Sequence, residues 1–520
     1  MTGKQTHHRW LWGPLVVALT SCAPISQLEV GPETAERPLG AIDVARIRQL
    51  HHITDELGDD LWPGFDTRTI PVAINNQDRE EMLVGHPDPP PEYRPFADFE
   101  LNGQPVMIRE GVTRYGPPGG GWAIDLGGEE TAYVGIPEGH ELPTDEYLSL
   151  LLHECFHCYQ QDYRESAEGL HGELPIDDAV YSALIELENR ILKAALEESA
   201  AEQLRNLAAM FVAVRHERRK DLPEHLILLE GEQEYAEGTA TYIQMRMYQL
   251  LAVRGGLPWV SEVEDPRYGG FADVGERYRA EVAGLARPAH RPTTFFFAMY
   301  KLGMAQGLIL DRLRPAWKEE MREKGINQFA VLEREFSLDQ EEESHLLAAA
   351  RERFAYDDLL SEQEKLVAEY LDTVRSYIDA PGRRYRLYYR ELGRRFQWKP
   401  RVGPLFKVPE SLEKVDHPRQ RTVWVAGFAR FEMEGLRFES GEVPMIFGDY
   451  IEWIDPDPAP DRSDLTIEAQ RQEEDVYEGL KLRSDDFSLE AARARLEWSE
   501  ELVEIHPLPP EGSEPAESPE

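Results

Sequence analysis

The chain has 520 residues, of which 41% are hydrophobic and 10% aromatic, so it can build a sizeable core and is not disordered throughout. Its 97 acidic and 56 basic residues give a formal net charge of -41, which repels phosphate backbones and argues against nucleic-acid binding. Three cysteines (Cys22, Cys155 and Cys158) are too few to hold a fold of this length together with disulfides.

The first 22 residues have the layout of an export signal. Basic residues precede an apolar run from Trp10 to Leu19 that is too short to span a bilayer. The run ends in Leu19-Thr20-Ser21-Cys22, which resembles the lipobox of bacterial lipoproteins and implies that Cys22 carries the lipid. We therefore expect an exported protein without a transmembrane helix in its mature chain. It would be anchored through Cys22 to the cell envelope, at the outer membrane or the periplasmic face rather than in the cytoplasm.

The remaining chain predicts an α+β fold with five successive regions. Residues 23–62 are expected to form a tether and one short helix. Residues 63–143 should be rich in β-structure, because β-branched and aromatic runs alternate with Pro and Gly clusters. Residues 144–380 have the helical period, and 381–455 return to strand-like runs with basic and aromatic residues. Residues 456–520 form an acidic segment whose last 15 residues are expected to be disordered.

Candidate catalytic residues lie in a predicted helix between Leu148 and Tyr159. The segment His153-Glu154-Cys155-Phe156-His157 has the pattern His-Glu-x-x-His, and helical residues four positions apart share a face. His153 and His157 can therefore direct two imidazole nitrogens at one zinc ion, with Glu154 beside it as a general base. The other positions of this segment are uncharged, as a buried active-site helix requires.

A third zinc ligand is expected downstream, because catalytic zinc usually has three protein ligands. Glu237 is the favoured candidate, since Gly238 and Ala240 remove bulk around it and would let its helix pack closely against the motif helix. Glu234 and Glu230 share its predicted helical face and remain alternatives.

The pattern His153-Glu154-Cys155-Phe156-His157, followed by Glu237-Gly238-Thr239-Ala240-Thr241-Tyr242, resembles the gluzincin metallopeptidases. The stretches Leu187–Leu196 and Gly303–Leu313 further resemble a group of uncharacterised bacterial zincin-like proteins, and this likeness covers roughly Leu61 to Trp317. The resemblance implies a zincin-like body, with a sheet beside the active-site helix and one zinc ion per chain. It also implies His153, His157 and Glu237 as ligands and Glu154 as base. The separation of 80 positions from His157 to Glu237 exceeds the usual gluzincin spacing, and the interval is expected to hold an inserted helical hairpin over 177–220.

These residues predict a zinc-dependent hydrolase that cleaves peptide bonds in a peptide or protein substrate. Tyr300 and His290 are candidates for steadying the oxyanion, and Thr241 is a candidate partner for a ligand histidine. Two alternatives stay open. One is a zincin-fold lipoprotein with little or no catalysis that serves as a binding or assembly module, and the other is an enzyme that hydrolyses non-peptide amides.

Two further features invite interpretation. Cys155 and Cys158 are expected to be buried thiols, with a redox pair as the alternative.

Between Arg383 and Lys407, nine basic residues and one acid are interleaved with aromatic residues, whereas residues 452–520 carry 21 acids and six bases. The first interpretation is that the basic stretch pairs internally with acidic parts of the chain, and the second is contact with anionic lipid headgroups.

Overall fold

The computed structural model describes residues 41–508 with some interruptions. Outside the described residues lie 1–40, 77–79, 102–103, 111–119, 137–142, 161–174, 176, 257–273, 287–294, 379–382, 389–395, 400–404, 408–421, 425–429, 434–435, 441–444, 448–450, 456–465, 474, 484–486, 500–501 and 509–520. The predicted signal peptide, Cys22 and His290 therefore fall outside the part that the structure describes. The chain divides into two compact units, the first formed by residues 1–174, 181–289 and 293–360 and the second by residues 175–180, 290–292 and 361–520.

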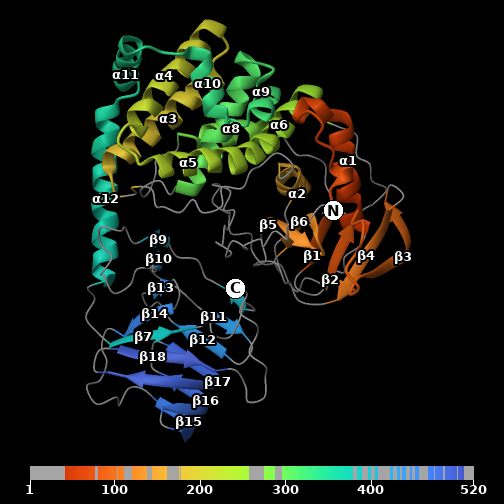
Figure 1. Ribbon diagram of the computed structural model, residues 1–520, viewed down its shortest axis with the longest axis vertical. Coiled ribbons are helices and arrows are strands. Elements are labelled where there is room, and N and C mark those ends of the chain that lie inside the picture. Colours follow the sequence, from red (N-terminus) through yellow and green to blue (C-terminus); the bar gives the residue numbers. More distant parts are fainter. Residues whose placement is uncertain are drawn as a thin grey trace, which may run out of the picture. The chain divides into compact units, whose positions relative to one another are not determined.

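The first unit begins with a helix and a six-stranded sheet (Figure 1). Helix α1 (Ala41–Leu61) is interrupted at Gly58, where φ is 30°. The strand order is β3-β4-β2-β1-β6-β5, and every neighbouring pair is antiparallel except β1 and β6. The strands are β1 (Val72–Asn76), β2 (Glu80–Val84), β3 (Arg94–Leu101), β4 (Gln104–Glu110), β5 (Gly121–Leu126) and β6 (Glu129–Ile136). The β-branched runs that predicted strands near residues 72, 82 and 133 are thus β1, β2 and β6.

Helices make up the rest of the first unit. They are α2 (Thr144–Gln160), α3 (Ala179–Glu197), α4 (Ala201–Arg219), α5 (Glu224–Gln233), α6 (Thr239–Arg254), α7 (Val274–Gly284), α8 (Phe295–Leu313), α9 (Trp317–Lys324), α10 (Gln328–Phe336) and α11 (Gln340–Arg353). The boundary between the units falls within α12 (Tyr356–Ile378). The hairpin expected over 177–220 is present as α3 and α4, which residues 198–200 join.

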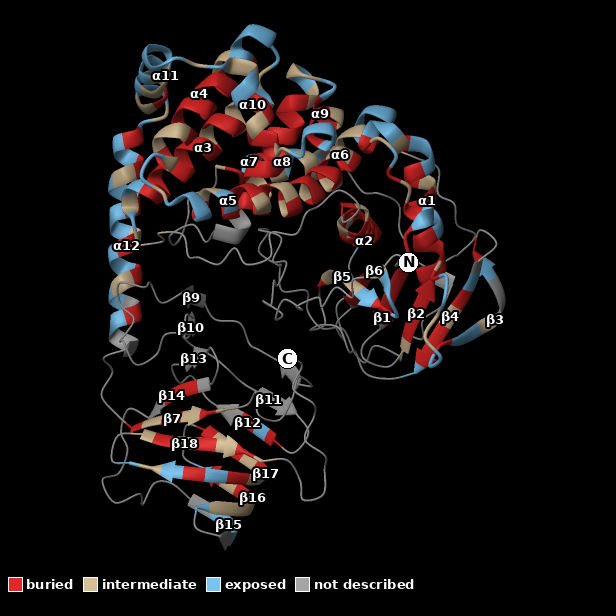
Figure 2. Cartoon of the chain, viewed as in Figure 1, coloured by how far each residue is buried: buried red, intermediate tan, exposed pale blue. Residues whose placement is uncertain are grey.

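Helix α2 is held in place by apolar packing along most of its length. It packs on β5 and β6, and buried residues occupy almost its whole length (Figure 2). Leu148, Leu151, Leu152 and Phe156 are at most 1% exposed and belong to one cluster with residues of α1, β1 and α8. The uncharged sequence around the histidine motif is therefore explained by burial, which the hydrophobic effect favours.

The second unit contains a twelve-stranded sheet. Its strands are β7 (Arg383–Leu387), β8 (Phe396–Lys399), β9 (Leu405–Lys407), β10 (Thr422–Trp424), β11 (Arg430–Met433), β12 (Leu436–Ser440), β13 (Met445–Phe447), β14 (Ile451–Asp455), β15 (Thr466–Glu473), β16 (Val476–Arg483), β17 (Phe487–Trp498) and β18 (Leu502–Pro507). Tyr385, Phe438, Trp453 and Phe487 form an aromatic core, with ring centroids of Tyr385 and Trp453 stacked at 5.4 Å. The chain thus contains two β-sheets in addition to its helices, which confirms the predicted α+β class.

The acidic C-terminal segment differs from its prediction. Four strands, β15 to β18, come from residues 466–507, and β18 pairs in parallel with β7 of the basic stretch. The expectation that the last 15 residues are disordered is wrong at its start, because His506 and Pro507 belong to β18. Despite the acidic composition, buried side chains largely alternate with exposed or partly buried ones in β17, and buried with partly buried ones in β18, which is the pattern of a half-buried sheet.

The described part of the basic stretch is paired inside the second unit. Arg384 Nη1 and Arg386 Nε lie 2.6 Å and 2.5 Å from the two carboxylate oxygens of the buried Glu452. The Tyr388 hydroxyl donates to Glu504 at 2.6 Å. Internal pairing with acidic residues, the first interpretation of this stretch, is therefore confirmed for Arg384 and Arg386. Arg390, Arg394, Arg395 and Arg401 lie outside the described residues.

Among the described helices, none combines the length and the apolar character needed to cross a bilayer.

Candidate metal centre

Three predicted ligands converge on one point. His153 Nε2 lies 3.0 Å from His157 Nε2, and Glu237 Oε2 lies 3.3 Å from the first and 3.2 Å from the second. Among the described residues, these three form a group whose donor atoms could share a metal ion. The side chains of His153, His157 and Glu237 are 6%, 16% and 24% exposed, so the group is open on the side of Glu237.

The spacing of the donor atoms fits a zinc ion. Ligand bonds of about 2.0–2.1 Å in a tetrahedral site place neighbouring ligand atoms about 3.3 Å apart. The three observed separations, 3.0–3.3 Å, lie close to that value. Two histidines and one glutamate also form a ligand set of catalytic zinc sites, which keep a fourth position for water.

Gln244 fixes the orientation of His153. The Gln244 amide nitrogen donates to the Ser149 carbonyl oxygen at 3.2 Å and to its hydroxyl at 3.0 Å, so the amide oxygen faces His153. That oxygen lies 3.2 Å from His153 Nδ1, which must therefore carry the proton. The lone pair of His153 is left on Nε2, the nitrogen that faces the other two ligands.

Gln160 fixes the orientation of His157 and also bonds the backbone segment that carries Glu237. Its amide nitrogen donates to the carbonyl oxygens of Tyr235 and Ala236 at 3.1 Å and 3.2 Å and contacts the Thr239 hydroxyl. Its amide oxygen, 3.0 Å from His157 Nδ1, therefore accepts the proton of that nitrogen. One side chain of α2 thus orients a histidine and holds the segment that carries Glu237.

That segment is a π-helical turn, η3 (Glu234–Gly238), between α5 and α6. A π-turn is rare and frees carbonyl groups from the regular helical ladder. Side chains bond the carbonyl groups of this turn: Gln328 bonds Glu234, Gln160 bonds Tyr235 and Ala236, Thr239 bonds Tyr235, and Thr241 bonds Glu237. The sequence predicted an uninterrupted helix here, because no sequence period identifies a π-turn.

Gly238 has a different neighbour from the predicted one. A Cβ atom on Gly238 would lie 2.6 Å from the Cα atom of Gly303, and one on Gly303 would lie 2.6 Å from the Glu234 carbonyl oxygen. Helix α6, which follows Gly238, packs against the motif helix α2 as predicted, but the close backbone contact of Gly238 itself is with α8. This contact also places Tyr300, one turn before Gly303, next to the donor group.

Tyr300, a candidate for steadying the oxyanion, lies beside the proposed ligands, and its hydroxyl bonds one of them, Glu237. Its ring stacks on that of His153, with centroids 6.2 Å apart and planes 14° apart. Burial raises the pKa of the Tyr300 hydroxyl, and the charge of Glu237 and a hydrogen bond to it raise it further. In this arrangement the hydroxyl is a neutral donor to Glu237.

Thr241 is not a partner of either ligand histidine. Its hydroxyl donates to the backbone carbonyl of Glu237, one turn earlier in the same helix, at 2.8 Å. The prediction for Thr241 is therefore wrong, because Gln244 and Gln160 occupy the Nδ1 positions of His153 and His157. Gln160 carried a readable signal, since it stands one helical turn after His157.

Glu154 is buried beside the donor group, and its surroundings favour the protonated form. Burial raises the pKa of Glu154, Glu237 acts in the same direction, and the two histidines oppose them. A Cβ atom on Gly121, the first residue of β5, would lie 2.5 Å from Glu154 Oε1. The missing side chain of Gly121 thus leaves room for the Glu154 carboxylate.

Charge coupling ties Glu237 to His157. Burial lowers the pKa of His157, but the charge and hydrogen bond of Glu237 outweigh it and raise the value to about 9. Burial likewise raises the pKa of Glu237, and His157 with His153 brings it well below its usual range. At neutral pH the metal-free site therefore holds an ionised Glu237 and a protonated His157, and a cation that binds there would displace the proton from His157 Nε2.

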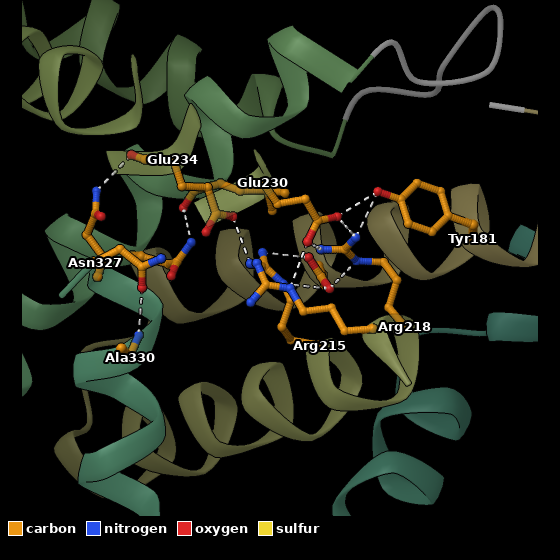
Figure 3. A network of polar contacts seen from close by, with 12 residues as sticks. Tyr181, Arg215, Arg218, Glu230, Glu234, Asn327 and Ala330 are labelled. Atoms are coloured by element: carbon orange, nitrogen blue, oxygen red, sulfur yellow. Dashed lines mark hydrogen bonds and ion pairs between the residues drawn. The ribbon is translucent and has the colours of Figure 1, made fainter. Parts of the chain in front are cut away.

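The two alternative third ligands are engaged elsewhere (Figure 3). Glu234 Oε1 pairs with Arg215 Nη1 at 2.8 Å, and Glu230 pairs with Arg218 and Arg219. Both glutamate side chains are fully buried among these arginines. Of the three candidates, only Glu237 faces the histidines.

The thiols of the motif helix are buried and unpaired with each other. Cys155 and Cys158 are free in the structure, and burial raises the pKa of both. A raised pKa keeps a thiol protonated and unreactive. This geometry favours the buried-thiol interpretation over a redox pair.

Comparisons of the chain with models of protein families, with curated proteins and with solved structures find no match.

Proposed function

We propose that this chain is a zinc-dependent hydrolase that cleaves peptide bonds, with a zincin-like body anchored to the envelope through Cys22. The observation that carries the proposal is the convergence of His153, His157 and Glu237 within 3.3 Å of one another beside the buried Glu154. Their donor atoms would hold one zinc ion. A bound ion would supply Lewis-acid polarisation of a carbonyl and would lower the pKa of a water molecule.

The chain's own residues would carry the proton. Glu154 would take it from the attacking water as a general base and deliver it to the leaving amine. Burial raises the pKa of Glu154, which makes its carboxylate a stronger base toward the attacking water. Gln160 and Gln244 would hold His157 and His153 with their Nε2 atoms directed at the ion.

Strand β5 supports a peptide rather than a small amide as substrate. It is the last strand in the order of the described sheet. It begins at Gly121, where a Cβ atom would lie 2.5 Å from Glu154 Oε1, so its first residue is directly beside the Glu154 carboxylate. An extended peptide can add to such an edge by main-chain hydrogen bonds, which would bring its scissile bond toward Glu154.

The test compares the full-length protein, purified in detergent, with its Glu154→Gln variant. Both should contain one zinc per chain, and the wild type should cleave members of a fluorogenic peptide library. The variant should lose about 10²–10⁴-fold in kcat, the usual contribution of a general base. Zinc in both proteins with no hydrolysis in either would favour the binding or assembly module. Wild-type protein without zinc would refute the proposal.

A further inference from the structure

A buried ion network surrounds Glu234, at the start of the π-turn (Figure 3). Arg215 donates through Nε and Nη2 to both oxygens of Glu188 at 2.9 Å and 2.8 Å, and through Nη1 to Glu234. Arg218 contacts Glu188 and Glu230, and Arg219 Nε lies 2.7 Å from Glu230. Three acids face three bases, so the network is neutral overall.

The network joins the inserted hairpin to the segment of the third ligand. Glu188 belongs to α3, and the three arginines belong to α4. Glu230 lies in α5, and Glu234 is the first residue of η3. The hairpin that lengthens the interval between His157 and Glu237 thus supplies the groups that hold the start of the ligand turn.

The two ends of the turn point in different directions. In a regular α-helix, Glu234 and Glu237 would share a face, because residues three positions apart are neighbours. Here Glu234 is directed at Arg215, whereas Glu237 is directed at His153 and His157. The additional residue in a π-turn separates the two faces. The direction of Glu237 therefore depends on keeping this turn in the π form.

The backbone of the turn is also held where it begins. Gln328 Nε2 donates to the Glu234 carbonyl oxygen at 3.0 Å, and Gly303 packs against that same oxygen. With the backbone of Glu234 held, only its side chain could still rotate, and the ion pair with Arg215 prevents this rotation. A buried ion pair adds little net stability compared with an apolar pair, but the planar guanidinium fixes the direction of its partners.

On these grounds we propose that the Arg215–Glu234 pair is a positioning device for Glu237 and sets the zinc affinity of the site from the α3–α4 hairpin. The inference rests on the proposed zinc site. Neither residue touches the donor group directly, so both act through the π-turn. Loss of the pair should let the turn relax toward a regular helix and draw the Glu237 carboxylate away from the histidines.

The test uses a paired substitution that keeps the network neutral. Arg215→Met with Glu234→Met removes one charge of each sign, and the fold should survive, because apolar residues of similar volume often replace buried ion pairs without loss of stability. The matched control is Glu81→Met with Arg109→Met. It removes another buried ion pair of the first unit, 2.9 Å long, which links β2 and β4 of the sheet.

Zinc Kd is measured by competition with a chromophoric chelator, together with the visible spectrum of the cobalt-substituted protein and the unfolding midpoint. We expect zinc binding about tenfold or more weaker in the Arg215/Glu234 variant, with a changed cobalt spectrum, because indirect partners of metal ligands are worth about 10–100-fold in affinity. The control pair should keep the wild-type Kd and spectrum whatever its midpoint.

A zinc Kd within about twofold of wild type in the Arg215/Glu234 variant would overturn the inference while leaving the zinc site intact. Equal weakening in the control pair would also overturn it, because the effect would then be one of general stability. Should the paired variant fail to fold, Glu234→Gln preserves the side-chain shape and is judged by the same affinities. Wild-type protein that binds no zinc overturns the proposed function and this inference together.

Discussion

Replacing Gln160 with leucine should weaken both the zinc site and the fold, because this one amide serves two elements. The change leaves the Nδ1 proton of His157 without its acceptor and removes the donor to the carbonyl oxygens of Tyr235 and Ala236. A buried group without a partner costs about 1–3 kcal/mol, and each lost hydrogen bond costs about 0.5–1.5 kcal/mol. The free energy of unfolding should therefore fall by about 2–6 kcal/mol.

The zinc affinity of the same variant should fall by about 10–100-fold, because His157 can then rotate and choose the other tautomer. Denaturant unfolding of the metal-free protein and chelator competition measure the two effects separately. Gln160→Glu is the informative companion, since its carboxylate can still accept from His157 Nδ1 but cannot donate to the turn. It should keep more of the zinc affinity than the leucine variant. Wild-type affinity in Gln160→Leu would refute the reasoning.

Three other predictions concern separate sites. Gly121→Ala should retain zinc but lower kcat for peptide hydrolysis by about tenfold or more, because its Cβ atom displaces the Glu154 carboxylate; an unchanged kcat would contradict this. His216 bridges two glutamates that raise its pKa, so the contribution of His216 to wild-type stability should be fully present below pH 6.5 and be lost as the pH rises through the raised pKa. His216→Gln should show a smaller decline in denaturant titrations, and the part due to His157, whose pKa is also raised, should remain. Thiol titration should find Cys155 and Cys158 unreactive when folded and both reactive after denaturation.

Local periodicity made the donor group predictable from the sequence. His153 and His157 share a helical face because they stand four residues apart, and a helix brings them together without help from the rest of the fold. The pairing of Glu237 with them is a long-range contact across 80 positions, and its signal was the small residues beside it. Gly238 does permit a close backbone contact, although its partner is Gly303.

The parts that sequence reasoning missed depend on tertiary structure. Glu230 and Glu234 look equivalent to Glu237 when a regular α-helix is assumed, and the π-turn and Arg215 separate them. Gln244 stands seven residues after Glu237 in sequence, and only the packing of α6 against α2 reveals its contact with His153. In the second unit, the acidic composition of the C-terminal segment obscured the alternation of β17 and β18, in which buried apolar residues such as Leu489, Leu496, Val503 and Ile505 alternate with more exposed ones.

The most direct test of the central claim is the zinc anomalous signal in X-ray diffraction from crystals of the full-length protein grown without chelators. The account predicts one peak per chain at about 2.0–2.2 Å from His153 Nε2, His157 Nε2 and a Glu237 carboxylate oxygen, with one further position open. No peak there, or an ion bound by other residues while Glu237 points elsewhere, would contradict it.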